Sequence, residues 1–354
     1  MRELFRPNIA SMRGYVPGEQ PQEGGFIKLN TNENPYPPSP LVLERLRAAC
    51  DQGLRLYPDP DALALRRQIG QVFAVDPRRI IAGNGSDELL NIIIRSFASE
   101  GDKIAYPQPT YGYYQPLIDI QGAKGCPVDF PDDFSLPDGL AVSGARITFL
   151  ANPNGPSGTL LPVGEVAALC RAVDGVLVID EAYVDFSQGG CIQLVETHSN
   201  AIVLRTMSKS FSLAGMRIGF AFAAEELIAG MWKVKDHYNL NRLSLVAAEA
   251  ALEDIEAMRA NAARICRTRD RLSERLCALG FYVWDSQANF VLARIDTVPA
   301  ISRDAATLYA ELKERKILVR YFDQPRLNDC LRISIGTDME IDALLAATAE
   351  ILGA

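Results

Sequence analysis

Histidine is nearly absent from this chain of 354 residues, which has only His198 and His237. A histidine-based catalytic triad or metal centre needs such residues in a defined arrangement, and these two have no ligand spacing. The seven cysteines are scattered, odd in number and without a C-x-x-C pair. This pattern argues against a disulfide framework or zinc site and favours reduced thiols in a cytoplasm. No metal site is predicted.

Long apolar runs and an excess of basic residues are also lacking. No run approaches the ~20 apolar residues of a membrane span. The N-terminal residues MRELFRPNIASMRGY lack the apolar core of a signal peptide. The net charge of −8 disfavours nonspecific binding to nucleic acid or to an anionic membrane. We therefore expect a cytoplasmic protein with neither nucleic acid nor a membrane as a partner.

The length exceeds the ~250–300 residues at which one core stops growing, so two domains are expected. Residues 1–40 are rich in proline and predict an irregular arm. Over residues 41–240, short apolar runs such as GVLVID and AIVLRT alternate with helical patterns. Strands buried on both faces have this pattern, so we expect a large α/β domain with a largely parallel sheet covered by helices.

The pattern changes after residue 240. Residues 243–280 form one long helical pattern rich in Ala, Leu, Arg and Glu. The strand-like runs NFVLARI, ILVRYF and CLRISIG follow, with helices expected over 302–315 and from about 338. Residues 241–354 therefore predict a smaller C-terminal α+β domain, to which part of the arm 1–40 also belongs.

The strongest chemical signal is Lys209, in the run RTMSKSFSLAGMRIGF. Thr206, Ser208 and Arg217 supply hydroxyl and guanidinium donors suited to a phosphate dianion. Asp180 ends the buried strand GVLVID, where open α/β sheets place ligands and where an unpaired charge is costly. A lysine that forms a Schiff base, donors for a phosphate and a carboxylate that keeps a ring nitrogen protonated are the needs of pyridoxal 5′-phosphate (PLP).

Four further residues fit a PLP site. Ser86 and Asp87 begin a helix after the glycine-flanked turn of IIAGNGSDELL, where free N–H groups attract phosphate. Tyr111 follows the strand KIAY and could stack on a planar ring. Tyr183 lies three residues after Asp180 and could bind the phenolate oxygen of the ring.

Substrate binding has two candidates, Arg332 and Arg320. Arg332, in the alternating strand CLRISIG, suits bidentate capture of a carboxylate, and Arg320 in ILVRYF is a weaker second candidate. Ordinary structural roles remain open for several of these residues: a surface position for Lys209, a helix cap for Ser86 and Asp180, a core aromatic for Tyr111 and a solvated edge for Arg332.

Eight motifs occur in order along the chain: LNTNENPYPPSP, YPDP, GNGSDELL, PTYGYY, NPNGPSG, DEAYVDF, SKSFSLAGMRIGF and LRISIGT. Over nearly its whole length the chain resembles the fold-type I PLP-dependent aminotransferases, most closely the histidinol-phosphate aminotransferase subgroup. The resemblance implies an α/β fold of the PLP-dependent transferase type. This fold has a mostly parallel seven-stranded sheet with helices on both faces, plus a smaller α+β domain.

By position, the resemblance implies a role for each motif residue. Lys209 would form the Schiff base and move a proton between the substrate Cα and the cofactor C4′. Asp180 would pair with the pyridine nitrogen, Tyr183 would donate to the ring oxygen and Tyr111 would stack on the ring. The phosphate positions fall on Ser86, Asp87, Thr206, Ser208 and Arg217.

The resemblance also implies substrate contacts and a homodimer. Arg332 corresponds to an arginine that binds the carboxylate of glutamate or 2-oxoglutarate, and Asn32 sits in the arm segment that lines the substrate pocket. Tyr57 in YPDP matches a tyrosine that reaches the neighbouring subunit's cofactor phosphate. The small-molecule partners would be an amino donor and a 2-oxo acid.

Two positions depart from the family pattern. Gly155 stands where the family often has an asparagine that contacts the ring oxygen, and Ser157 replaces threonine. Asn154 is then the candidate for that contact, which is otherwise lost. Pro37 stands where relatives commonly have glycine, which stiffens the arm.

The expected reaction is ping-pong transamination from histidinol phosphate to 2-oxoglutarate, giving imidazole acetol phosphate and glutamate in histidine biosynthesis. An aromatic amino acid aminotransferase and a PLP-dependent decarboxylase of a phosphorylated amino acid remain alternatives, because motifs near the cofactor do not separate them. A PLP-binding module of a transcription regulator is a further alternative, but it would need a DNA-binding domain, and this acidic chain has no such segment.

Overall fold

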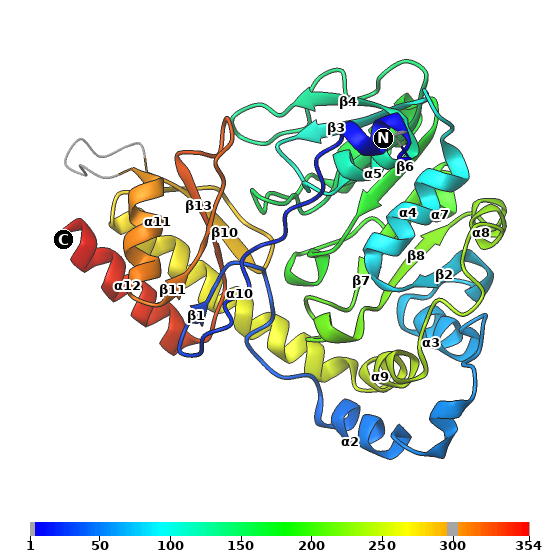
Figure 1. The fold of residues 1–354 in the computed structure, drawn as a ribbon, viewed down its shortest axis with the longest axis horizontal. Helices are drawn as coiled ribbons and strands as arrows, with labels where there is room; N and C mark the ends of the chain where they lie inside the picture. The colour runs from blue at the N-terminus through cyan, green and yellow to red at the C-terminus, as the bar shows by residue number, and fades with distance from the viewer. Residues whose placement is uncertain (1–3, 296–303, 354) are drawn as a thin grey trace.

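The computed structural model describes residues 4–295 and 304–353 (Figure 1). Its largest element is a seven-stranded sheet in which β8 pairs antiparallel with both neighbours and the other pairs are parallel. In spatial order the strands are β2 (Ile80–Gly83), β8 (Gly219–Ala223), β7 (Ala201–Thr206), β6 (Val176–Asp180), β5 (Ala145–Ala151), β3 (Lys103–Gln108) and β4 (Lys124–Asp129). The predicted mostly parallel seven-stranded sheet is confirmed.

Helices cover both faces of this sheet because successive strand side chains point to opposite sides. In β7, Ile202 and Leu204 belong to one apolar cluster, whereas Ala201 and Val203 belong to another. The first cluster includes residues of α4 (Gly85–Phe97), α5 (Tyr114–Gln121) and α8 (Glu225–Trp232). The second includes residues of α3 (Leu63–Phe73), α6 (Val163–Ala172), α7 (Leu194–Thr197) and α9 (Arg242–Glu253).

A smaller antiparallel sheet lies beside the large one, on the left of Figure 1. Its strands, in order, are β12 (Arg320–Tyr321), β13 (Cys330–Ser334), β10 (Phe290–Arg294) and β9 (Tyr282–Val283). The helices α10 (Ile255–Ala278), α11 (Ala305–Glu314) and α12 (Asp338–Leu352) pack with it. The described residues also form four short 3₁₀ helices: Gln52–Arg55, Pro77–Arg79, Val184–Phe186 and Ala214–Met216.

The prediction of one long helix over 243–280 was wrong. α9 ends at Glu253 and α10 begins at Ile255, because Asp254 has a non-helical backbone with φ −110° and ψ 52°. The Asp254 carboxylate accepts a hydrogen bond from the hydroxyl of Ser39, which caps the start of α2 (Pro40–Ala49). Because this contact joins segments far apart in the chain, the helical periodicity of the sequence does not reveal it, and the prediction therefore missed the break.

The N-terminal arm is more ordered than expected. It contains α1 (Pro7–Ser11) and β1 (Ile27–Lys28). Asn8 donates to the carbonyl of Asp119 in α5 at 2.7 Å, and β1 pairs in parallel with β11 (Ile317–Leu318). The arm therefore runs from a helix of the large sheet to the region of the small one (Figure 1). Among the described helices, none is long and apolar enough to cross a membrane.

Candidate active site

The predicted site residues gather around one cavity of about 450 Å³. Its walls come from the ends of β5, β6 and β7, from the arm, and from β12 and β13. This is the carboxyl edge of the parallel strands, where α/β sheets bind ligands. The predicted residues that line it are Asn32, Ser86, Asp87, Tyr111, Asp180, Tyr183, Thr206, Ser208, Lys209, Arg217, Arg320 and Arg332. Tyr57 and Asn154 do not line it.

Asp180 is a buried carboxylate in the wall of this cavity. Its Oδ2 accepts from the hydroxyl of Tyr114 at 3.1 Å, and its Oδ1 accepts from the backbone N–H of Ala182 at 3.2 Å. Burial raises the pKa of Asp180 from 3.8 to about 6; the anions Asp87 and Glu181 act in the same direction, and the two hydrogen bonds oppose them. The site thus offers a carboxylate whose charged form needs a cation.

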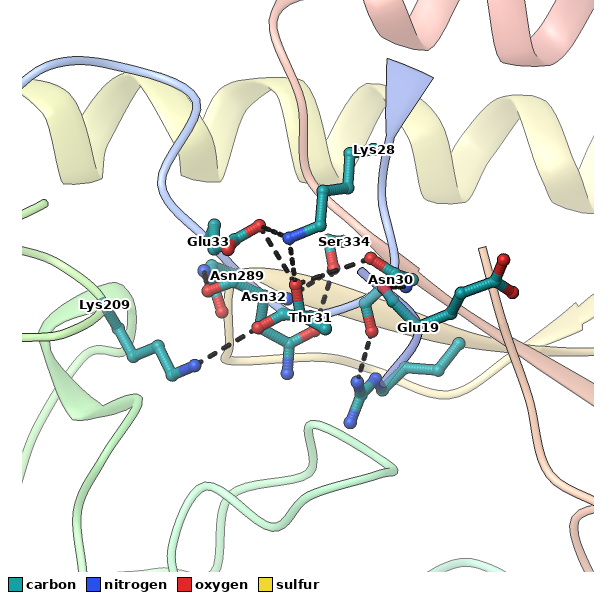
Figure 2. Close-up of polar contacts among 10 residues, drawn as sticks. Glu19, Lys28, Asn30, Thr31, Asn32, Glu33, Lys209, Asn289 and Ser334 are labelled. Atoms are coloured by element: carbon teal, nitrogen blue, oxygen red, sulfur yellow. Dashed lines mark hydrogen bonds and ion pairs between the residues drawn. The ribbon is translucent and has the colours of Figure 1, made fainter. Parts of the chain in front are cut away.

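Lys209 also lines the cavity, from the turn after β7. Its Nζ donates to the carbonyl of Thr31 at 3.3 Å (Figure 2) and lies 5.8 Å from the centre of the Tyr183 ring. The Asn34 amide donates to the carbonyls of Lys209 and Ser210, each at 3.1 Å. The arm therefore holds both the backbone and the amine of this lysine in place.

Asn32 was predicted to contact substrate, and its hydrogen bonds favour another role. Its side chain is 2% exposed and its φ of 57° lies in the left-handed region, which asparagine tolerates better than most residues. Its Nδ2 donates to the hydroxyl of Tyr183 at 3.0 Å, and its Oδ1 accepts from the hydroxyl of Ser334 at 2.9 Å, as Figure 2 shows for Ser334. These bonds favour a role in positioning Tyr183 over a contact with substrate.

A cluster of donors lies at the start of α4. The Arg217 guanidinium donates to the hydroxyl of Ser208 at 3.3 Å, and the hydroxyl of Thr206 donates to the same oxygen at 3.0 Å. Gly85 begins α4 with a φ of +81°, and a Cβ there would lie 2.6 Å from Nη2 of Arg217. Free helix N–H groups, two hydroxyls and a guanidinium together form a site for a phosphate.

Asp87 belongs to this cluster, but its carboxylate is already engaged. It accepts from the hydroxyl of Tyr111 at 3.0 Å and forms an ion pair with Arg217 at 3.1 Å. A carboxylate would repel a phosphate. We therefore expect the side chain of Asp87 to orient Tyr111 and Arg217 instead of touching a phosphate itself. Burial raises the pKa of Tyr111 well above its usual value, so its hydroxyl stays a donor.

Two arginines face the cavity from the small sheet. Arg320 on β12 and Arg332 on β13 are direct cross-strand partners. Arg332 donates to the carbonyl of Asn30 at 2.9 Å, while its buried Nε has no partner within the described chain. Burial lowers the pKa of Arg332, and the nearby charges that affect it come from Tyr183, Arg320 and Tyr15, none of them a carboxylate. Two neighbouring guanidinium groups of this kind suit an oxyanion of a ligand.

Comparison with known proteins agrees with this geometry. The model of the aminotransferase class I and II family matches residues 25–347. The chain belongs to this family. Histidinol-phosphate aminotransferase 1 of Nostoc sp. is 44% identical over 355 residues, and the match covers 99% of both chains. Histidinol-phosphate aminotransferase of Geotalea daltonii is 45% identical over 348 residues and covers 98% of this chain and 99% of its own.

Solved aminotransferase structures share the fold of this family member. Histidinol-phosphate aminotransferase from Sinorhizobium meliloti, in complex with pyridoxal-5′-phosphate, aligns with a TM-score of 0.90 and 27% identity. That alignment covers 100% of this chain and 98% of the other. An aspartate aminotransferase variant from Thermus thermophilus aligns with a TM-score of 0.81 at 22% identity, which supports the fold alone.

Two predicted residues of this aminotransferase lie outside the cavity. The amide of Asn154 bonds to Ser157 of its own loop at 3.0 Å, and to Thr110 and Pro109 of the segment after β3 at 2.8 and 3.2 Å. Asn154 therefore shapes the loop that carries Gly155, and this arrangement does not favour the proposed ring contact. Tyr57 is 78% exposed and stacks on Tyr238 with ring centres 4.4 Å apart.

The sequence pattern missed two contributions to the site. Residues Tyr15, Val16, Pro17, Gly18 and Gln20 of the arm line the cavity. Nothing in their composition predicted this, because only the path of the arm across both sheets brings them there. Tyr114 was also overlooked, although it stands in the quoted motif PTYGYY, and its bond to Asp180 gives it a place beside the site.

Proposed function

We propose that this aminotransferase binds PLP and transfers the amino group of histidinol phosphate to 2-oxoglutarate, giving imidazole acetol phosphate and glutamate. The names of the relatives from Nostoc and Geotalea and the PLP complex of the Sinorhizobium protein support this proposal. The observation that carries it is a single cavity that combines a lysine amine, a buried carboxylate, a phosphate site and a second oxyanion site.

The residues of the cavity fit PLP. Asp180 would hold the ring nitrogen, Tyr183 the ring oxygen and Tyr111 the ring face. The cluster of Thr206, Ser208, Arg217 and the start of α4 would hold the phosphate. When bound, PLP supplies an aldehyde that condenses with an amine and a cationic ring that withdraws electrons from the carbon being deprotonated.

Lys209 would serve twice. Its amine would hold the cofactor through the aldehyde and, once freed by the amino donor, would act as the base at the substrate Cα. The Thr31 carbonyl, which now accepts from Nζ at 3.3 Å, would keep the released amine beside the reacting carbon. In this role the lysine would take the proton from the substrate Cα and carry it toward the cofactor.

The two arginines would bind both substrates in turn. A guanidinium donates the same pair of parallel hydrogen bonds to a phosphate or to a carboxylate. Arg332 and Arg320 would thus hold the phosphate of histidinol phosphate in one half-reaction and a carboxylate of 2-oxoglutarate in the other. Tyr15 of the arm also lines the cavity and lies near both arginines.

We also propose a homodimer with shared sites and the division into residues 1–40, 41–240 and 241–354. Tyr57 and Tyr238 stack on each other and are both exposed, and the side chains of Leu54 and Leu56 are exposed as well. Exposed apolar side chains that lie together often mark a contact with another protein, which supports the dimer proposal. Tyr57 would then enter the neighbouring subunit's site.

The test is a panel of amino donors with the purified, PLP-loaded protein and 2-oxoglutarate. We expect kcat/KM for histidinol phosphate to exceed that for phenylalanine by at least about 100-fold, since phenylalanine lacks both the phosphate group and the imidazole ring of histidinol phosphate. Lys209→Ala should lose about 100- to 10,000-fold in kcat. Preference for phenylalanine would support an aromatic aminotransferase, and CO₂ release without a keto acceptor would support the decarboxylase.

A further inference from the structure

Tyr114 is fully buried at the first position of α5, next to the cavity but outside its lining. Its ring stacks on Phe149 of β5, with centres 4.7 Å apart and planes 12° apart. Its hydroxyl donates to Oδ2 of Asp180 at 3.1 Å. Packing on one side and a hydrogen bond on the other hold this tyrosine in a single orientation toward the carboxylate.

Few groups near Asp180 favour its charged form. Burial and the anions Asp87 and Glu181 all disfavour the charged carboxylate, and among the described residues the Tyr114 hydroxyl and the Ala182 N–H oppose them. Of these two opposing groups, the hydroxyl is the stronger. It is also a permanent donor, because burial raises the pKa of Tyr114 well above its usual value.

We propose that Tyr114 is the positioning residue of Asp180, fixing the carboxylate in the orientation and charge state that pairs with the protonated ring nitrogen of PLP. The inference rests on the proposed function. Tyr114 acts only through Asp180, since its ring and hydroxyl do not reach the cavity. It differs in this from Tyr111, which packs edge-on against it at 5.5 Å but lines the cavity itself.

The test compares two ligands in the variant Tyr114→Phe. This substitution removes one oxygen and keeps the stacking on Phe149. The ligands are PLP and an analogue whose ring nitrogen is replaced by carbon, which cannot pair with Asp180 through a ring N–H. The wild-type protein should bind PLP more tightly than the analogue. In Tyr114→Phe this preference should shrink by about tenfold or more, the effect of one hydrogen bond to a charged group.

The affinity of Tyr114→Phe for the carbon analogue should stay close to that of the wild-type protein, because this analogue has no ring nitrogen with which Asp180 could pair. In the Asp180→Asn protein, adding Tyr114→Phe should leave the preference unaltered, since the two residues act as one unit. The kcat for the amino donor should fall with little change in its KM.

Tyr106→Phe is the matched control. Tyr106 is another buried tyrosine of the same apolar cluster, but its hydroxyl donates to Gln115. Its loss should leave the preference for PLP over the analogue at the wild-type value. An equal effect of both variants would show that buried tyrosines act here through general packing, and would overturn the inference.

Further outcomes would overturn either the inference about Tyr114 or the proposed function. If Tyr114→Phe keeps the wild-type preference, or if it loses both affinities equally, Tyr114 only packs and the inference fails while the proposed function stands. If the wild-type protein forms no borohydride-reducible link between PLP and Lys209, the proposed function itself fails and the inference falls with it.

Discussion

Asp180 shows how one residue links stability to function. Its folded-state pKa is raised to about 6 by burial. A raised acid pKa means that the folded protein holds this proton more tightly than the unfolded chain. Its contribution to stability is therefore full below about pH 4 and is lost as the pH rises through about 6. Among the residues that the structure describes, no cation offsets this cost for the buried carboxylate.

Asp180→Asn should remove this pH dependence. Between about pH 4 and pH 7, the free energy of unfolding of the cofactor-free variant should rise relative to wild type by on the order of 3 kcal/mol. Urea unfolding of both proteins across this range measures the difference. A difference that stays constant with pH would contradict the assignment of Asp180 as the buried, titrating acid.

A substitution at Asn32 can test the direction of its hydrogen bond with Tyr183. Its Nδ2 donates to the hydroxyl of Tyr183, which leaves that hydroxyl's own proton for the cofactor. Asn32→Asp has nearly the same shape and tolerates the left-handed backbone, but it would accept the proton of Tyr183 instead. We expect about a tenfold loss in kcat/KM and in PLP affinity, the range for one redirected hydrogen bond.

The control for Asn32→Asp is the same change in a Tyr183→Phe protein. Without the hydroxyl, the substitution at Asn32 should have little further effect on PLP affinity. An equal loss in both backgrounds would show that Asn32 acts on something other than Tyr183.

At the scale of elements, the start of α4 depends on a glycine for two separate reasons. Gly85 has a φ of +81°, and a Cβ there would lie 2.6 Å from the Arg217 guanidinium. Gly85→Ala should lower the free energy of unfolding by about 1 kcal/mol through backbone strain. It should also weaken PLP binding, because Arg217 must move away from the phosphate site.

Gly101→Ala separates these two effects. Gly101 has a φ of +82°, but a Cβ there meets nothing within 4 Å. Its substitution should cost a similar free energy of unfolding, measured by urea denaturation, and leave the PLP affinity unchanged in a fluorescence titration. Equal PLP affinities in the two variants would contradict the role given to the contact between Gly85 and Arg217.

At the scale of the whole molecule, shared sites predict complementation between two inactive proteins. In a mixed dimer of Lys209→Ala and Tyr57→Ala subunits, one site would combine the intact Lys209 of one chain with the intact Tyr57 of the other. Random assembly on co-expression should restore about a quarter of the wild-type sites. Activity no greater than that of the two parents, or a monomeric mass in solution, would contradict the dimer.

Much of the architecture was predictable because its causes are local. Strands such as GVLVID and AIVLRT are apolar on both faces, and this pattern alone predicts a sheet covered by helices. The break at Asp254 and the pairing of β1 with β11 were not predictable, since each depends on a bond between segments far apart in the chain. The division into domains stays a prediction.

By itself, the sequence determined the chemistry: an amine at Lys209, a carboxylate at the end of a buried strand, and donors for a phosphate. Residue type and position along a strand are sufficient for that, because the carboxyl ends of parallel strands meet at one edge. Only the tertiary structure decided which groups those residues contact. Tyr114 donates a hydrogen bond to Asp180, Asn32 donates one to Tyr183, and the arm lines the cavity. Each of these contacts joins residues far apart in the sequence, and no local periodicity predicts such contacts.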